Sequence, residues 1–232
     1  MRQRLLALAL VVVASIGIVA YFLRDAYPRS ILVDGQQREY FFHQPQTVRQ
    51  PVPLILMFHG FSGTAAGLRE RSGLHELVDE YKTAVAYLDG QPSWHRPSEG
   101  RVNPDVRFIE EVIGKYSAAE IIDRNRVYLA GMSMGGDFVI RAASQRSDLI
   151  AAVVAQAMVT DQAVPAERAF PMLIIVGTED DRVSEETLAR VPDAFRSQGH
   201  EVTVICPEGV GHQWHPPLNR TLIEFLLQHS LD

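Results

Sequence analysis

The stretch around Ser133 constrains the fold of this chain more than any other. It reads Gly131-Met132-Ser133-Met134-Gly135, follows an apolar run at residues 127–130 and precedes a helical stretch at residues 135–146. A serine on a sharp turn between a strand and a helix needs small residues two places before and two places after it, and the two glycines meet that need. This context predicts an exposed, nucleophilic serine, with an ordinary glycine-rich turn as the alternative.

A nucleophilic serine needs a general base, a group that orients the base and an oxyanion hole. Residues 171–177 read as a buried strand, and Glu179, Asp180 and Asp181 follow it. A carboxylate just past the carboxyl end of a parallel strand lies at the edge of the sheet where ligands bind. We expect Asp180 to orient the base, with Asp181 and Glu179 as alternatives. Any of the three could instead be an acid ahead of the helix expected at residues 184–198.

The expected base follows the last strand of the chain. Residues 201–206 read as that strand, and a glycine-rich loop after it carries His212. His215 is the rival base, although it stands before two prolines at the entrance to the last helix. The separations from Ser133 to Asp180 and from Asp180 to His212 each leave room for roughly one βα unit of about 30 residues. The chain order serine, acid, histidine is that of an α/β-hydrolase.

The oxyanion hole requires backbone N–H groups that point at the developing charge. One donor is expected from Met134, the residue after the nucleophile. The other is expected from Phe61, in the loop His59-Gly60-Phe61-Ser62-Gly63 that follows an apolar strand at residues 52–58. His59 could itself act as a base, but in this setting we expect it to brace the loop through hydrogen bonds.

With these motifs the chain resembles the α/β-hydrolase esterases that group feruloyl esterases, acetyl xylan esterases and polyhydroxyalkanoate (PHB) depolymerases. The resemblance runs from about Arg38 to about Leu227, and its landmarks are residues 59–63, 88–90, 94, 105–109, 122–127, 131–136, 177–180 and 211–214. It implies a mostly parallel central sheet with helices on both faces and no large lid domain. It also implies that Ser133 is the nucleophile, Asp180 the acid and His212 the base.

The activity expected from this pattern is hydrolysis of carboxylic esters through an acyl-enzyme. The substrate is a small-molecule or oligomeric ester, and feruloyl, acetyl, short aliphatic and hydroxyalkanoate esters all stay open. A serine peptidase with the same triad, or a non-catalytic anchored binding domain, is the alternative function. Trp94, in a long loop at residues 89–100, and Trp214 are expected to line the substrate site. Trp94 could instead be a packing anchor of its loop.

Composition excludes several other classes of protein. The formal net charge is −6, and four of the arginines lie before residue 30, so the rest of the chain is more acidic still. That balance argues against nucleic-acid binding. The scattered histidines form no metal-binding motif, and we expect neither a metal nor a cofactor. Cys206 is the only cysteine, so no intrachain disulfide forms, and we expect it to end a buried strand.

The first residues predict a membrane segment. Residues 5–23 carry no charge, and as a helix at ~1.5 Å per residue they would be about 28 Å long, close to the thickness of a bilayer core. Arg2 and Arg4 precede this run, which places the rest of the chain outside the cytoplasm. We expect residues 1–29 to be an uncleaved signal anchor with a short linker, or else a cleaved signal peptide. Residues 30–232 are then one catalytic domain facing the periplasm or exterior.

Elsewhere strands and helices alternate, which implies a mostly parallel sheet. Residues 30–33 and 38–42 are expected to pair as a hairpin around Asp34-Gly35. A continuous amphipathic helix is expected over residues 68–81, and a strand over residues 83–88. Asn103 and Pro104 form a helix start, with Asn103 as the cap. Residues 151–155 read as another buried strand, and residues 217–229 as a closing helix.

Overall fold

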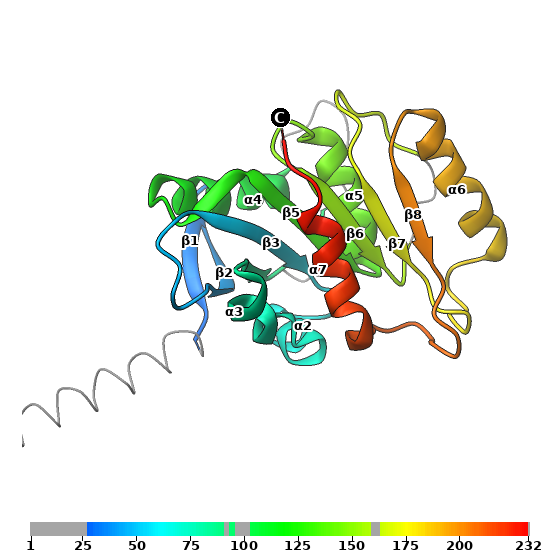
Figure 1. Cartoon of the computed structure of the whole chain (residues 1–232), viewed down its shortest axis with the longest axis horizontal. Helices are drawn as coiled ribbons and strands as arrows, with labels where there is room; N and C mark the ends of the chain where they lie inside the picture. Colours follow the sequence, from blue (N-terminus) through cyan, green and yellow to red (C-terminus); the bar gives the residue numbers. More distant parts are fainter. Residues whose placement is uncertain (1–26, 91–92, 96–102, 159–162, 232) are drawn as a thin grey trace, which may run out of the picture.

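The computed structural model describes residues 27–90, 93–95, 103–158 and 163–231 (Figure 1). The expected membrane segment at residues 5–23 lies outside these ranges, as do parts of the expected pocket loop at residues 89–100. Within the described ranges, no helix combines the length and the apolar character that a membrane crossing requires.

One eight-stranded sheet organises the domain, in the order β1-β2-β4-β3-β5-β6-β7-β8 (Figure 1). Its strands are β1 (Arg29–Val33), β2 (Gln36–His43), β3 (Val52–Phe58), β4 (Ala84–Leu88), β5 (Ile122–Met132), β6 (Ala152–Gln156), β7 (Met172–Ile175) and β8 (Val202–Ile205). Strand β2 is antiparallel to both β1 and β4, and every other pairing is parallel. The expected mostly parallel sheet is therefore confirmed.

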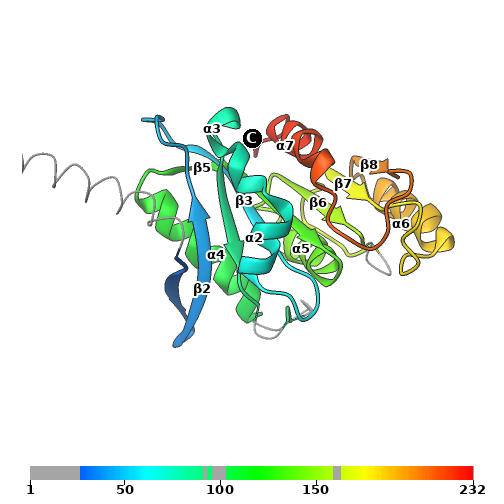
Figure 2. The same cartoon turned by 90° about the horizontal axis from the view of Figure 1, so that it is seen from below.

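Helices cover both faces of this sheet, as Figures 1 and 2 show. They are α2 (Ala65–Ser72), α3 (Val78–Tyr81), α4 (Pro104–Ala118), α5 (Met134–Gln145), α6 (Glu185–Ser197) and α7 (Asn219–Leu227), with short 3-10 helices at Leu74–Leu77 and Pro216–Leu218. Helices α4, α5 and α6 pack their apolar side chains on one face, while α2 and α7 pack theirs on the other.

Strand β3 lies at the centre of the sheet and is buried along its whole length. Because successive side chains of a strand point to opposite faces, Leu54, Leu56 and Phe58 join the core beneath α4 and α5. Ile55 and Met57 join the core beneath α2 and α7. A continuous apolar run in the sequence thus corresponds to a strand that is covered on both faces.

Two local predictions are confirmed by the backbone. Asp34 and Gly35 both take positive φ angles, 47° and 81°, and join β1 to β2 in a tight hairpin. Asn103 caps α4, because its Oδ1 accepts hydrogen bonds from the N–H groups of Asp105 and Val106, while Pro104 occupies the first turn.

Two other predictions are wrong. The amphipathic pattern at residues 68–81 does not form one helix, because Gly73 takes a left-handed φ of 60° and ends α2 with its N–H bonded to the Arg69 carbonyl. Cys206 does not end a buried strand but is exposed. It follows β8, which lies at the edge of the sheet and is only partly covered.

Candidate active site

Ser133 sits on a strained turn between β5 and α5. Its φ and ψ are 55° and −120°, a positive φ that costs energy for any residue with a side chain. A Cβ added to Gly131 would lie 2.2 Å from the Gly135 carbonyl oxygen, and a Cβ added to Gly135 would lie 2.3 Å from the Phe58 oxygen. Only glycine fits at either position, as expected from the sequence, and the turn holds the serine above the strand end.

The three residues expected to form the triad are linked in series. Ser133 Oγ lies 2.9 Å from His212 Nε2, and His212 Nδ1 lies 3.0 Å from each carboxylate oxygen of Asp180. The Asp180 side chain is fully buried, whereas that of His212 is 14% exposed. Because an ionised carboxylate only accepts, His212 donates from Nδ1 and leaves Nε2 free to accept the serine hydroxyl proton.

Of the three acids that follow β7, Asp180 is the one that reaches His212. Glu179 and Asp181 are both exposed on the surface of the same turn. One oxygen of Asp180 also accepts the N–H of Arg182 at 3.0 Å, which fixes the carboxylate on its second side. The rival base His215 precedes the 3-10 helix at Pro216–Leu218, away from this series of hydrogen bonds.

Backbone contacts join the loop of Asp180 to the loop of His212. The N–H of Thr178 donates to the Pro207 carbonyl at 3.1 Å, and the N–H of Glu179 donates to the Val210 carbonyl at 3.0 Å. The Thr178 hydroxyl accepts the N–H of Gly209 at 3.0 Å. The two loops therefore form one unit, and the spacing of acid and histidine follows from it.

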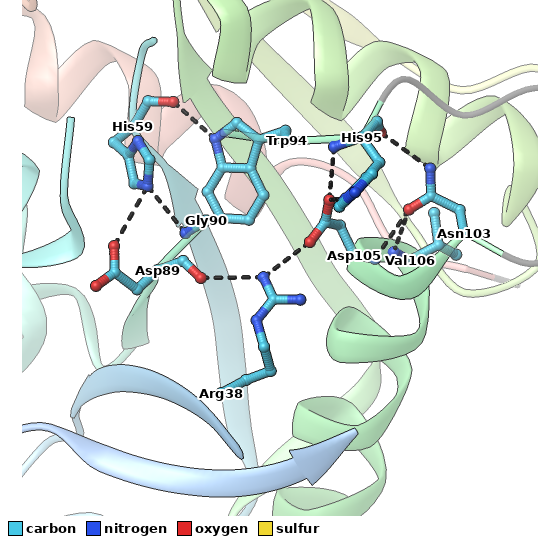
Figure 3. Close-up of polar contacts among 9 residues, drawn as sticks. All are labelled: Arg38, His59, Asp89, Gly90, Trp94, His95, Asn103, Asp105 and Val106. Carbon is cyan, nitrogen blue, oxygen red and sulfur yellow. Dashed lines mark hydrogen bonds and ion pairs between the residues drawn. The ribbon is translucent and has the colours of Figure 1, made fainter. Parts of the chain in front are cut away.

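The loop after β3 is braced by His59, as expected. This residue is fully buried, and its Nε2 accepts the N–H of Gly90 at 2.9 Å. Its Nδ1 therefore carries the proton and donates to the Gly60 carbonyl at 2.8 Å. Nε2 also lies 3.4 Å from Asp89 Oδ1, so both ring nitrogens are engaged inside the loop, a setting for support and not for proton transfer with a substrate (Figure 3).

The two expected oxyanion donors flank Ser133. Gly60 is so close that a Cβ on it would lie 3.3 Å from Ser133 Cβ, and Phe61 follows it directly. Met134 is the first residue of α5, where backbone N–H groups have no acceptor within the helix. The Phe61 side chain is 69% exposed and borders the cavities on both sides of Ser133.

Trp94 is buried and also borders a cavity. Its Nε1 donates to the His59 carbonyl at 2.8 Å, and its ring stacks on Phe138 at a centroid distance of 5.2 Å with 23° between the planes. It is only 6% exposed, so it is a packing anchor. It also borders a cavity beside Ser133, and its role as a wall of a substrate site stays a prediction.

A buried ion pair supports the segment that carries Trp94 (Figure 3). Arg38 Nη2 donates to Asp105 Oδ1 at 2.8 Å and to the Asp89 carbonyl at 3.0 Å, and both side chains of the pair are almost completely buried. Asp105 Oδ2 accepts the backbone N–H of His95 at 2.6 Å and lies 2.8 Å from His95 Nδ1. Residues 93–95 are thereby tied to α4 and β2.

Two cavities meet at Ser133. One, of about 450 Å³, is lined by Gly60, Phe61, Gly63, Arg71, Met132, Ser133, Arg182, His212, Gln213 and Trp214. The other, of about 330 Å³, is mainly apolar and is lined by Phe61, Trp94, Ser133, Met134, Asp137, Phe138 and Met158. The sequence analysis did not identify Asp137 and Phe138 as residues that line this cavity. Both lie on α5, the helix that follows Ser133.

Trp214 is buried in the protein core and also borders a cavity. It is 4% exposed, and its Nε1 donates to Asn219 Oδ1 at 3.0 Å, which anchors the start of α7. Its remaining surface borders the cavity that contains His212. In the part of the chain that the structure covers, no group of three or more His, Cys, Asp or Glu side chains is placed to hold a metal ion.

The strand order, the serine turn and the two loops that follow β7 and β8 define an α/β-hydrolase fold. The chain belongs to the dienelactone hydrolase family, whose sequence profile matches residues 82–222. The resemblance to α/β-hydrolase esterases is thus confirmed at the level of fold and family.

Known relatives and solved structures agree with this placement. The chain is 31% identical over 185 residues to the putative esterase NocK of Nocardia uniformis subsp. tsuyamanensis, which covers 75% of this chain and 54% of NocK. It is 28% identical over 142 residues to feruloyl esterase B of Piromyces equi, covering 56% of this chain and 26% of that protein. The structure of a thermostable esterase superposes with a TM-score of 0.72 and 22% identity, over 90% of this chain and 64% of that one. The chain spans only about half the length of NocK.

Proposed function

We propose that this chain is a serine esterase that hydrolyses carboxylic esters. The observation that carries the proposal is the series Ser133 Oγ, His212 Nε2 and Asp180 carboxylate on a strained strand-to-helix turn. Ser133 Oγ attacks the ester carbonyl while His212 Nε2 takes its proton, and Asp180 holds the imidazole in the required tautomer. His212 then gives the proton to the leaving alcohol as the carbon–oxygen bond breaks.

Deacylation repeats these steps with water as the nucleophile. Water attacks the acyl-serine carbonyl, His212 takes a proton from it, and the same proton returns to Ser133 Oγ as the acid leaves. In each half-reaction negative charge develops on the carbonyl oxygen. We assign the N–H groups of Phe61 and Met134 as its donors, because both residues flank Ser133 and the first N–H groups of a helix favour negative charge.

The position of His212 supports an assignment of the two cavities to the two parts of an ester. The leaving alcohol must receive its proton from His212 Nε2, so it lies in the cavity that His212, Gln213 and Trp214 border. The acyl group then lies in the apolar cavity, which Trp94, Phe138 and Met158 help to line. This arrangement fits an acyl group of small to moderate size. The names of the relatives, an esterase and a feruloyl esterase, support the same class of substrate.

The first residues of the chain support a proposal about its location. We propose that residues 1–29 anchor the chain in a membrane and leave residues 30–232 in the periplasm or exterior. The charge-free run at residues 5–23 and the arginines before it support this arrangement. Extraction of cell membranes with carbonate and then with detergent tests it: release by detergent alone supports the anchor, and release by carbonate contradicts it.

The test of the catalytic proposal is ester hydrolysis by the purified chain and its Ser133→Ala variant. We expect the wild type to hydrolyse 4-nitrophenyl esters, and we expect kcat of the variant to be lower by several orders of magnitude. The thermal unfolding midpoint of the variant should not fall below that of the wild type. Ser133 already has a strained positive φ, and alanine keeps the same Cβ there, so the replacement adds no backbone strain. Normal turnover by a variant preparation free of contaminating hydrolases would contradict the proposal.

A further inference from the structure

A cavity of about 670 Å³ lies at the end of the domain opposite Ser133. It is bordered by the first residues of β3, by Arg126 in β5 and by the carboxyl ends of α3 and α7, and Figure 2 shows these two helices side by side. Ser133 follows the last residue of β5, Met132, which lies about 20 Å beyond Arg126 at ~3.3 Å per residue of strand. A ligand in this cavity would therefore not contact the catalytic residues.

The described lining residues of this cavity include three basic side chains and no acidic one. The basic residues are Arg49, Lys82 and Arg126. The chain as a whole has 28 acidic and 22 basic residues, so its composition does not favour a cavity lined by positive charge alone. A cleft lined by one sign of charge focuses the electric field and attracts ions of the opposite sign. The cavity therefore favours an anionic ligand.

Most of this positive charge has no partner within the part of the chain that the structure describes. Arg49 and Lys82 are exposed, and neither makes a hydrogen bond or an ion pair with a described residue. Arg126 donates from Nε to Asp123 Oδ2 at 2.7 Å, while its two terminal nitrogens make no such contact. Asp123 thus offsets one of the three charges and orients the guanidinium, and the terminal nitrogens of Arg126 stay available to a ligand.

The acidic side chains beside the cavity are engaged with other groups. Glu224 accepts the hydroxyl of Tyr81 at 3.0 Å, and Glu80 lies 2.8 Å from Arg220 Nη2. Neither carboxylate belongs to the described lining. The positive charge of the lining is therefore left largely for a ligand.

The number of cations favours a phosphoryl group over a carboxylate. A carboxylate has two oxygens, and a single guanidinium can engage both of them. A phosphate monoester has three terminal oxygens and a charge of about −1.5 to −2 at pH 7, so it can accept hydrogen bonds from three cations at once. The other walls include apolar side chains that can contact the uncharged body of such a ligand: Val48, Pro51, Val52, Pro53 and Leu227.

We propose that this cavity binds a phosphoryl group carried on a partly apolar molecule, with Arg49, Lys82 and Arg126 as its donors. The volume of the cavity lies within the range of small-molecule sites, roughly 300–1,000 Å³. The inference does not depend on the proposed esterase function, because none of the catalytic residues borders this cavity.

A phosphoryl group can come from a soluble phosphate monoester or from a lipid headgroup, and titration calorimetry of the full chain in an uncharged detergent distinguishes them. The soluble arm compares phenyl phosphate with benzoate, which keeps the ring but carries a carboxylate. The lipid arm compares dihexanoyl phosphatidic acid with dihexanoyl phosphatidylcholine, which has no net charge, and uses the Ser133→Ala variant so that no ester is cleaved. Tighter binding of phosphatidic acid than of phenyl phosphate assigns the lipid headgroup as the source, and the reverse order assigns a soluble phosphate.

Two variants test the donors separately, Lys82→Met and Arg126→Met. We expect saturable binding of phenyl phosphate to the wild type, about tenfold or more tighter than that of benzoate. Each variant should weaken the binding of phenyl phosphate by about 10- to 100-fold, as for the loss of a hydrogen bond between charged groups. The matched control is Arg124→Met, which removes the same charge from an exposed residue of β5 outside the described lining, and its Kd should stay within about twofold of the wild type.

Four results would overturn the inference. The first is an absence of saturable binding by both phosphoryl probes, and the second is binding of benzoate as tight as that of phenyl phosphate. The third is binding that persists unchanged in both Lys82→Met and Arg126→Met, because the phosphoryl group then lies elsewhere, for example beside Ser133. The fourth is an equal loss in Arg124→Met, which would show a general attraction to positive charge and no defined site.

Discussion

The carbonyl oxygen of Val210 occupies the space that a side chain on Gly177 would need, only 1.9 Å from the position of its Cβ. Gly177 lies three residues before Asp180, and Val210 lies two residues before His212. Backbone approach between these two residues is what brings the loop after β7 against the loop after β8. The geometry of acid and histidine is therefore set by a contact in which neither takes part.

Replacing Gly177 by alanine should impair catalysis strongly. The added Cβ must push the two loops apart, and a displacement of about 1 Å in a catalytic group can lower the rate about 100-fold. The measurement is kcat/KM for a 4-nitrophenyl ester. Gly114→Ala is the matched control, because a Cβ there meets nothing within 4 Å. In the middle of α4 it should raise stability by roughly 1 kcal/mol and leave activity unchanged.

Asp180→Asn should lower kcat by a factor of about 10³ to 10⁴, because asparagine favours the wrong tautomer of His212. Asp181→Asn changes an exposed side chain on the same turn and should alter kcat by less than about twofold. Steady-state kinetics of the two variants under identical conditions decide between them. Equal losses, or a larger loss in the Asp181 variant, would show that the acid has been assigned to the wrong residue.

The Arg38–Asp105 pair should be far more sensitive to the loss of one partner than of both. Arg38→Met leaves the Asp105 carboxylate buried without its guanidinium, which costs about 3–5 kcal/mol. Arg38→Met combined with Asp105→Leu should recover part of that loss, because no charge is then stranded. Urea unfolding of the three proteins gives the comparison.

A partly exposed pair provides the reference for this effect. Arg107 and Glu110 approach to 3.7 Å on α4, with the Arg107 side chain 48% exposed. Arg107→Ala should change the free energy of unfolding by less than about 1 kcal/mol. If the double variant at Arg38 and Asp105 were less stable than Arg38→Met alone, the pair would contribute to stability in its own right.

The sequence contains enough information for the serine turn but less for what surrounds it. The Gly-x-Ser-x-Gly spacing alone predicts the turn, and the contact between Gly131 and Gly135 is local, although the close approach of Gly135 to the Phe58 carbonyl comes from the fold. The choice of Asp180 over Asp181 needs burial, which the local sequence does not encode. Arg38 on β2 and Asp105 on α4 are 67 residues apart in the sequence, and only the tertiary fold brings them together.

The remaining differences have local physical causes. The pattern at residues 68–81 keeps its apolar face across Gly73, so periodicity alone could not reveal that the helix ends there. Cys206 follows an apolar run that predicts a buried strand. That strand, β8, lies at the edge of the sheet, where fewer neighbours cover it. Asp137 and Arg141 stand four apart on a predicted helix, a visible ion-pair spacing. Their burial against a cavity could come only from the fold.

Lowering the pH should destabilise this protein at pH values well above those at which carboxylates titrate, and His43 is a main cause. Burial, then the neighbouring His75 and Arg69, lower the pKa of His43 from 6.5 to about 3. The unfolded chain therefore binds a proton below pH 6.5 that the folded chain does not. Stability is fully present above pH 6.5 and is lost as the pH falls toward 3, by about 2 kcal/mol at pH 5 from this residue.

His43→Gln removes this titration and keeps an acceptor for Arg69, whose Nε donates to His43 Nε2 at 3.0 Å. Urea unfolding at pH 7 and pH 5 should show a smaller loss of stability for the variant than for the wild type. An equal pH dependence in wild type and His43→Gln would show that His43 is protonated in the folded protein.

Reaction of the purified chain with a fluorophosphonate, followed by peptide mapping, tests the central claim most directly. Such a probe modifies a serine only when a base and an oxyanion hole activate it. We predict stoichiometric labelling at Ser133 in the wild type, none in Ser133→Ala, and labelling at least about 100-fold slower in His212→Ala. A folded wild type that is not labelled, or is labelled at a serine other than Ser133, would contradict the account.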